Sequence, residues 1–513
     1  IVAAAAAEPA LAPAAVPAAD TALAARPPPA AARRGAVGFA LGLAAFALAS
    51  VAIATWHRTH APAAAPRSGA VTSGLVAVLP AHVHSALAQD GWMRLGLMAL
   101  GADALRALPQ HAVVPSESVI AALGTAGDDD AAAAARVRAA TGAATIVHID
   151  GRRERDRWQL EATLDGADGR RQTIGVDAGD AVAAGAALGE RLRLAIGAEP
   201  AAAAEAADAP ETLALAARIQ ADLLDGRAAR ALAQADDAGA PLAAAPRIVL
   251  LRAKAMNRLG RADEATAAVR ALIARATAGA PWLAEAWTTL GYSELVDGRR
   301  EDAERDFRNA LAALGNDRVE AGRAWRGLGN AQAAREDFDA AEASFLRARM
   351  ELEGSGDRLL QAHLLDDLGS VAARRGRFDE AIARYGEAAT AAAAIGGGEI
   401  ELGARMNIAL AQQERLQHEA ALDSWRALLP RVRALDYPAM RRFAAIHYAD
   451  ALAEAGALSE AAAALDDAGS ADELGARDAL EDARLDALRV KLALGDAHAV
   501  AASARTLAGA PGA

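Results

Sequence analysis

The segment that decides the fold is AWTTLGYSELVDGRREDAERDFRNAL, residues 286–311. Its pattern returns in AWRGLGNAQAAREDFDAAEASFLRA at 324–348 and in LLDDLGSVAARRGRFDEAIARYGEA at 364–388. The leading glycines recur at intervals of 38 and 40 residues: Gly291, Gly329 and Gly369. A period of this length indicates a repeat in which each unit buries its apolar face against its neighbours.

Each unit predicts two antiparallel helices. The small glycine and alanine positions allow the helices to approach closely, and a glycine such as Gly298 or Gly376 provides the turn between them. We expect the aromatic positions to fill the spaces between helices as core rather than to bind a ligand: Trp287, Phe307, Trp325, Phe345 and Tyr385. The alanine-rich composition, with only 4% aromatic residues, also favours a mainly α protein.

This pattern of Trp-x-x-Leu-Gly, then a small residue, then an aromatic residue four positions later, resembles the tetratricopeptide family. Weaker units lie around Gly226, Gly260, Leu416 and Gly456, and a degenerate one surrounds Gly495. The resemblance therefore predicts an α-solenoid of about eight tetratricopeptide-like helix pairs over residues 207–510. The run AIGGGEI at 394–400 is interpreted as a turn between repeats, since it lacks the Gly-Lys-Ser/Thr end of a phosphate-binding loop.

The resemblance implies that the first helix of each pair lines a concave groove. By its register the groove-facing residues are Thr288, Tyr292, Arg323, Arg326, Asn330, Asp366, Ser370 and Met406. They do not form the Lys/Asn clamp that holds C-terminal carboxylates in chaperone-binding members of the family. The expected partner is thus a protein or peptide of unspecified sequence, and the alternative is a merely solvated face.

Residues 74–198 have a different pattern. Short apolar runs predict strands at 75–79, 145–150, 158–164 and 172–176, the last two joined by the hairpin signal DGADG, and HAVVPSESVIAAL at 111–123 predicts a strand, a Pro-Ser turn and a short helix. Helical spacing predicts helices between them and a closing helix at 178–196, with Ser116 as an N-cap. Alternation of strands and helices at this pace indicates a small α/β domain.

The runs VAVLP, LGLMALGADALRAL, AVVPSESV and HIDGRRERDRWQLEATLDGADG resemble, in this order, the TolB-like N-terminal domain of bacterial signalling proteins. The resemblance covers about residues 74 to 170. It departs from the family at Ala81, where phenylalanine is usual, and at Asp150 before Gly151. In that family the domain is non-catalytic, so the resemblance implies a binding role.

Catalytic, cofactor and metal sites are not expected. The chain has no cysteine and contains neither a Gly-x-Ser-x-Gly elbow nor an HExxH motif. A hydrolase-like alternative would gather the serines Ser116 and Ser118 with histidines on one sheet edge: His82, His84, His111 and His148. His57 and His60 lie one helical turn apart, but polar residues at a membrane edge explain them as well as a metal does.

Residues 35–56 contain no charged side chain over 22 positions. As a helix they would be about 33 Å long, which matches the hydrocarbon core and favours a transmembrane helix over a signal peptide or a buried helix. An Ala/Pro-rich tether, 1–34, precedes this segment and a linker, 57–73, follows it. Arg26, Arg33 and Arg34 before the span, against Arg58 and Arg67 after it, place the N-terminus in the cytoplasm and the C-terminal domains in the periplasm.

A net charge of -12 argues against direct contact of this chain with nucleic acid. The order of tether, span, α/β domain and repeats resembles the membrane and C-terminal half of CadC-like regulators, in which a winged-helix domain precedes the tether. We therefore expect a non-enzymatic, single-pass inner-membrane signalling protein, with the effector domain upstream of residue 1. Alternatives are the C-terminal part of a membrane Ser/Thr kinase or nucleotide cyclase, and an envelope scaffold without an effector; a homodimer is left open.

Overall fold

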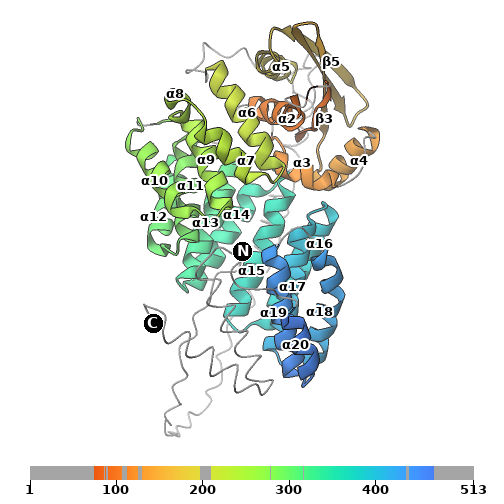
Figure 1. Ribbon diagram of the computed structural model, residues 1–513, viewed down its shortest axis with the longest axis vertical. Coiled ribbons are helices and arrows are strands. Elements are labelled where there is room, and N and C mark those ends of the chain that lie inside the picture. Colours follow the sequence, from red (N-terminus) through yellow and green to blue (C-terminus); the bar gives the residue numbers. More distant parts are fainter. Residues whose placement is uncertain are drawn as a thin grey trace, which may run out of the picture. The chain divides into compact units, whose positions relative to one another are not determined.

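The computed structural model describes residues 74–85, 87, 90–106, 112–124, 130–196, 209–277, 279–315, 317–434 and 438–466. The expected tether, transmembrane helix and linker, together with His111 and the degenerate unit at Gly495, lie outside the described residues. Within the described residues, no helix combines the length and apolarity needed to cross a membrane. The chain is mainly α, with a small α/β sheet followed by paired helices (Figure 1).

Five strands form one mixed sheet: β1 (Val76–Val78), β2 (His82–His84), β3 (Thr145–Glu154), β4 (Arg157–Gly166) and β5 (Arg171–Ala178). Their order is β1-β3-β4-β5, with β2 also paired to β3. The first two strands run parallel to β3, whereas β3, β4 and β5 form an antiparallel meander. The strands predicted at 75–79, 145–150, 158–164 and 172–176 are confirmed. The strand predicted just before Pro115 is wrong, because Val113 forms only an isolated bridge with Val76. Strand β2 was not predicted by the sequence pattern.

The sheet has one apolar and one polar face. Along β4, Trp158, Leu160, Ala162 and Leu164 are buried, while the residues between them are less buried. Two helices pack on the apolar face, α2 (Met93–Arg106) and α5 (Ala181–Ala195). The other helices of this region are α3 (Ser116–Leu123) and α4 (Asp130–Thr141).

The residues at the N-termini of α5 and α3 determine where these two helices begin. Asp180 caps α5, because its carboxylate accepts hydrogen bonds from the backbone N–H groups of Val182 and Ala183. The predicted N-cap role of Ser116 is wrong. Pro115 occupies the N-cap position without a side-chain hydrogen bond, and Ser116 is the first helical residue.

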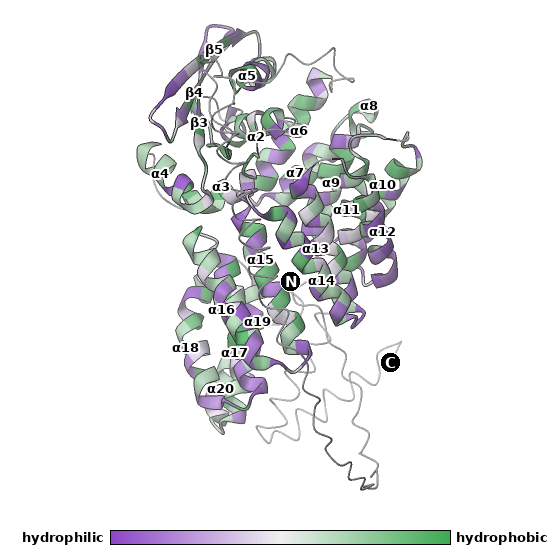
Figure 2. Ribbon diagram, turned by 180° about the vertical axis from the view of Figure 1, so that it is seen from behind, coloured by the Kyte–Doolittle hydropathy of each residue, from purple (hydrophilic) through white to green (hydrophobic). Residues whose placement is uncertain are grey.

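Paired helices make up the rest of the described chain. They are α6 (Pro210–Leu224) with α7 (Ala228–Asp236), α9 (Pro246–Arg258) with α10 (Ala262–Ala274), α11 (Leu283–Val296) with α12 (Arg300–Ala313), α13 (Arg318–Ala334) with α14 (Phe338–Leu352), α15 (Arg358–Arg374) with α16 (Phe378–Ala394), α17 (Gly398–Glu414) with α18 (His418–Arg433) and α19 (Pro438–Glu454) with α20 (Leu458–Asp466). A short helix, α8 (Ala240–Ala243), precedes α9. Hydrophobic and hydrophilic residues mix along these helices, and α12 is strongly hydrophilic (Figure 2).

The repeat signature is explained by contacts between glycines and aromatic rings. A Cβ atom on Gly291 or Gly329 would lie 2.9 or 2.5 Å from the ring of Phe307 or Phe345, respectively. Gly369 has the same relation to Tyr385, at 2.7 Å. These distances are shorter than any normal carbon contact, so the first helix needs glycine where the aromatic ring of the second helix packs. Phe307, Phe345 and Tyr385 are therefore core, as predicted, whereas Trp287 and Trp325 are half-buried and pack against the core clusters.

The turn inside each pair requires a left-handed backbone. Gly298 and Gly376 have φ of 75° and 70°, as the sequence predicted. Two other pairs place a non-glycine residue in this turn, namely Glu336 with φ of 66° and Leu416 with φ of 59°. A side chain in this conformation is strained, because its Cβ approaches the backbone.

The first repeat helix shares its core with the α/β region. Ala217 and Ala221 of α6 are buried in the same hydrophobic cluster as the sheet and α2. The guanidinium of Arg218 lies 5.5 Å from the ring centroid of Trp92, which is a cation-π distance. Farther along, Ser118 Oγ donates a buried hydrogen bond of 2.8 Å to Asp357 Oδ1. The sheet and the repeats are thus joined by packing.

Candidate functional site

The first helices of the central pairs, α11, α13, α15 and α17, carry the residues predicted to face the groove. We call the surface formed by these residues the A-helix face: Thr288, Tyr292, Arg323, Arg326, Asn330, Asp366, Ser370 and Met406. Six of the eight are half-buried, which fits residues that face a recess. Thr288 and Met406 are buried instead, at 5% exposure each. The Thr288 hydroxyl bonds the carbonyl of Ala284 within its own helix.

Polar contacts join each first helix to the next one. The Tyr292 hydroxyl of α11 donates to the backbone carbonyl of Arg323 on α13, at 3.0 Å. Arg326 of α13 binds both carboxylate oxygens of Asp367 on α15. Asn407 of α17 donates to Asp366 of α15 at 3.0 Å. These contacts form a ladder across four successive repeats, and they fix the spacing of the A-helix face.

The contacts of the ladder and the burial of its side chains shift the pKa values of ionisable groups on these helices. Burial opposes the charge of Arg326, but Asp367, Tyr292 and Asp366 together outweigh it and raise the pKa of the guanidinium. Burial and the charge of Asp367 together raise the pKa of Asp366 to about 6. Burial, with a contribution from Arg326, lowers the pKa of His363 to about 3, so this imidazole is neutral at physiological pH.

Two side chains on these helices keep unused hydrogen-bonding groups. Neither the Asn330 amide nor the His363 imidazole has a hydrogen-bond partner among the residues that the structure describes. Both are half-buried. Each offers a donor and an acceptor, which is what the backbone of a bound peptide requires.

The structure also shows members of the face that the sequence reasoning missed, namely His363, Asp367 and Asn407. All three lie on the same helices as the predicted residues. The signal available in the sequence was the acidic pair Asp366–Asp367, because two adjacent carboxylates in a helix need cations or donors from its neighbours. Ser370 accepts a hydrogen bond of 3.1 Å from Tyr385 of the second helix, so it serves the repeat core as well.

The α/β region holds a shallow pocket of 450 Å³ beside its polar sheet face. His82 and His148 line it together with Asp150, Arg138 and Glu161. The structure thus brings two of the predicted histidines together, while His84 lies nearby and contacts Asp150 at 2.9 Å. Among the described residues, no group of three or more side chains is arranged to hold a metal ion.

The two serines of the hydrolase-like alternative do not join these histidines. Ser118 is buried and bonded to Asp357, and Ser116 is buried at 5% exposure. Neither residue lines the pocket. The geometry therefore places no serine nucleophile beside a histidine base in this part of the chain.

The chain matches no protein-family model. No curated protein matches its sequence. Among solved structures, it is similar to a signal transduction ATPase with numerous domains from Pyrococcus horikoshii, which has a tetratricopeptide repeat sensor. The identity is 15%, the TM-score is 0.41, and the match covers 60% of this chain and 48% of that one.

Two further solved structures are similar to this chain. A Rap protein complexed with Competence and Sporulation Factor has 11% identity and a TM-score of 0.41, covering 58% of this chain and 94% of its own. A thermophilic TPR protein of Thermus thermophilus has 21% identity and a TM-score of 0.31, covering 40% and 98%. The paired helices, with their glycine-aromatic contacts, form a helical repeat with a small α/β region before it.

Proposed function

We propose that this chain is a membrane-anchored, non-enzymatic interaction protein that binds a peptide segment of a protein partner along the A-helix face. The observation that carries the proposal is the combination of a fixed polar ladder with the unused groups of Asn330 and His363. A preorganised surface loses little conformational freedom when a ligand binds, which favours affinity. The two unused side chains supply the hydrogen bonds that an extended peptide needs.

We further propose that this scaffold is the sensor half of a one-component transcriptional regulator in the inner membrane. The support is the resemblance of residues 74–170 to the TolB-like domain and the order of elements along the chain, which is that of CadC-like regulators. In those proteins a winged-helix domain precedes the tether. The repeats would then lie in the periplasm and bind the partner there. An envelope scaffold and the C-terminal part of a membrane kinase are the alternatives.

Peptide binding is tested with the full chain in detergent and a phage-displayed library of random 12-residue peptides. Enriched peptides are synthesised with a fluorophore, and their affinities are measured by fluorescence anisotropy. We expect Asn330→Ala and His363→Ala each to weaken binding about tenfold, which is the effect of one lost hydrogen bond of about 1.4 kcal/mol.

The matched control is Arg347→Ala, an exposed position on the second helix α14. It is expected to bind like the wild type. If no peptide is enriched over a surface without protein, or if the Asn330 and His363 variants bind as tightly as the control, the A-helix face is not the binding site.

A further inference from the structure

A polar pair recurs between the two helices of two repeats, buried in the first and half-buried in the second. In α13 and α14, Ser344 Oγ donates to Gln332 Oε1 at 2.7 Å, across 12 positions of sequence. In α17 and α18, Ser424 Oγ donates to Gln412 Oε1 at 2.8 Å, again across 12 positions. In both pairs a donor meets an acceptor, and buried polar groups require such a match.

In α11 and α12 the same two positions hold Glu294 and Asp306. Glu294 follows Gly291 by three residues, as Gln332 follows Gly329, and Asp306 is 12 residues farther on. Both side chains are almost completely buried, with 0% and 2% of their surface exposed. Ionised carboxylates are acceptors only, so this pair lacks the donor that the other repeats have.

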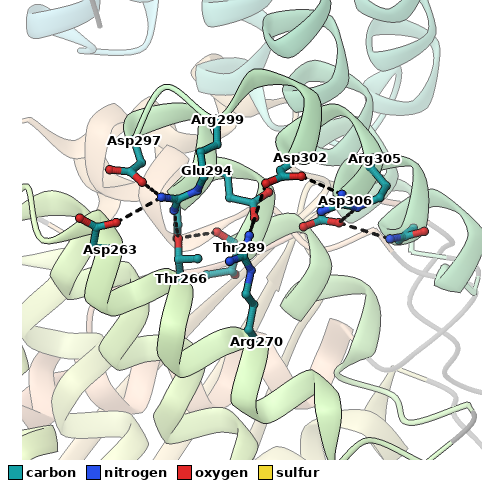
Figure 3. A network of polar contacts seen from close by, with 12 residues as sticks. Asp263, Thr266, Arg270, Thr289, Glu294, Asp297, Arg299, Asp302, Arg305 and Asp306 are labelled. Carbon is teal, nitrogen blue, oxygen red and sulfur yellow. Dashed lines mark hydrogen bonds and ion pairs between the residues drawn. The ribbon is translucent and has the colours of Figure 1, made fainter.

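Each carboxylate has one oxygen with a donor and one without. Arg270 donates to Glu294 Oε1, and Arg305 Nε donates to Asp306 Oδ1 at 3.1 Å (Figure 3). Asn309 also donates to Asp306 Oδ1, at 3.4 Å. The remaining oxygens, Glu294 Oε2 and Asp306 Oδ2, are buried and have no donor among the described residues. Two buried acceptors without a donor are costly, whereas one proton between them satisfies both.

The other charged side chains around Glu294 and Asp306 have ion-pair partners of their own. Asp302 of α12 lies 3.6 Å from Arg270 and also pairs with Arg305. Arg299 contacts Asp263, Asp297 and Thr266 (Figure 3), and Arg335 of α13 pairs with Glu301 and Glu304. On α9, Lys254 pairs with Glu285 near the opposite end of α11, and Asn257 donates to Ser293. The remaining nearby cations thus have other carboxylates to bind, and among the described residues Arg270 and Arg305 are the cations that contact the pair.

We propose that Glu294 and Asp306 share one proton, and that loss of this proton loosens the packing of α11 against α12, so that this helix pair responds to pH. The pKa of Glu294 agrees with this geometry. Burial, the hydrogen bond with Asp306 and its charge raise the pKa of Glu294 to about 7, against the opposing effect of Arg270.

The direction of the pH effect follows from the raised pKa. Between the ordinary pKa of 4.5 and about 7, the folded pair keeps a proton that the opened state has released. The stabilisation is therefore complete below pH 4.5 and is lost as the pH rises through 7. Because α11 also carries Tyr292 of the A-helix face, loosening this helix would move one end of the ladder.

The test is hydrogen-deuterium exchange of the full chain in detergent at pH 6 and pH 8, read by mass spectrometry and corrected for the intrinsic rate. With pKa values of about 7 folded and 4.5 opened, the opening equilibrium of α11 and α12 is expected to rise about tenfold between these pH values. The internal control is α13 and α14, whose Gln332–Ser344 pair does not titrate, and whose corrected exchange is expected to stay constant.

Two variants separate the shared proton from other pH effects. Glu294→Gln gives this repeat the residue of α13 and supplies a permanent donor, and Asp306→Asn does the same from the other helix. Each is expected to abolish the tenfold change. The infrared band of protonated carboxyls at pH 6 is expected to lose the intensity of one carboxyl and to keep the part that comes from Asp366, whose pKa is about 6. The proposal fails if wild-type α11 and α12 change no more than the control pair. It also fails if either folded variant keeps the tenfold change.

Discussion

The ring of Phe307 is enclosed by two glycines, and this makes Gly327→Ala a sharp test of the repeat packing. A Cβ atom at Gly327 would lie 2.1 Å from Phe307 Cε1 and 2.3 Å from Cζ. Carbon atoms in contact are normally about 3.5–4.0 Å apart. Phe307 is fully buried, and Gly291 lies close to the same ring, where a Cβ would be at 2.9 Å. The ring therefore has no space into which to retreat.

The expected magnitude follows from two opposing effects. Overpacking a core costs about 1–3 kcal/mol, and the short contact places this site at the upper end. Alanine is favoured over glycine in a helix interior by about 1 kcal/mol, which offsets part of the cost. We expect Gly327→Ala to lower the free energy of unfolding by about 2 kcal/mol.

The matched control is Gly386→Ala, in the interior of α16, where an added Cβ meets no atom within 4 Å. Here only the helix preference acts, so a gain of up to about 1 kcal/mol is expected. Urea unfolding of the full chain in detergent, followed by far-UV circular dichroism, compares the two variants, and hydrogen exchange in α12 and α13 locates the effect. The packing argument is refuted if Gly327→Ala unfolds at the same urea concentration as Gly386→Ala. Adding Phe307→Leu to Gly327→Ala is expected to restore part of the loss.

Two further predictions concern a turn and the membrane. Leu416 is 74% exposed and has φ of 59°, so Leu416→Gly is expected to stabilise the chain by about 1 kcal/mol in the same urea assay. The control Gln417→Gly, at φ of -90°, is expected to destabilise the chain. Equal effects of the two substitutions would contradict the backbone strain at Leu416. Deletion of residues 35–56 is expected to release the protein from membranes, because those residues form an uncharged, apolar run long enough to cross the hydrocarbon core. Continued sedimentation of the deleted protein with membranes would show that another segment anchors it.

The sequence predicts the repeat well because its main constraint is steric. A glycine at 291, 329 or 369 has one explanation in a helix rich in alanine, namely the close approach of a ring, and the partner ring lies at a fixed distance along the chain. A glycine between the two helices of a pair, such as Gly298 or Gly376, predicts the left-handed turn equally well. Glu336 and Leu416 show the limit of that signal, since tertiary packing imposes the same turn on residues that do not favour it.

The site was predictable only in part, because it depends on which side chains meet across repeats. The register identified the first helices and the half-buried positions such as Tyr292 and Arg326. It did not show that Arg326 would be bound by Asp367, or that Asp366 would be held by Asn407, since these partners are 41 residues apart. The sequence pattern did not predict strand β2 for a similar reason. It has three residues, and only its pairing with β3 makes it a strand.

Helix α6 has a consequence for how the protein can be divided. Its apolar residues complete the core beneath the sheet, while its opposite side belongs to the first helix pair. A cut between the sheet and the repeats, near residue 200, would therefore leave an apolar strip uncovered on both fragments and favour aggregation of each. The smallest fragment that keeps both cores covered therefore includes α6 together with the sheet and the first helix pair.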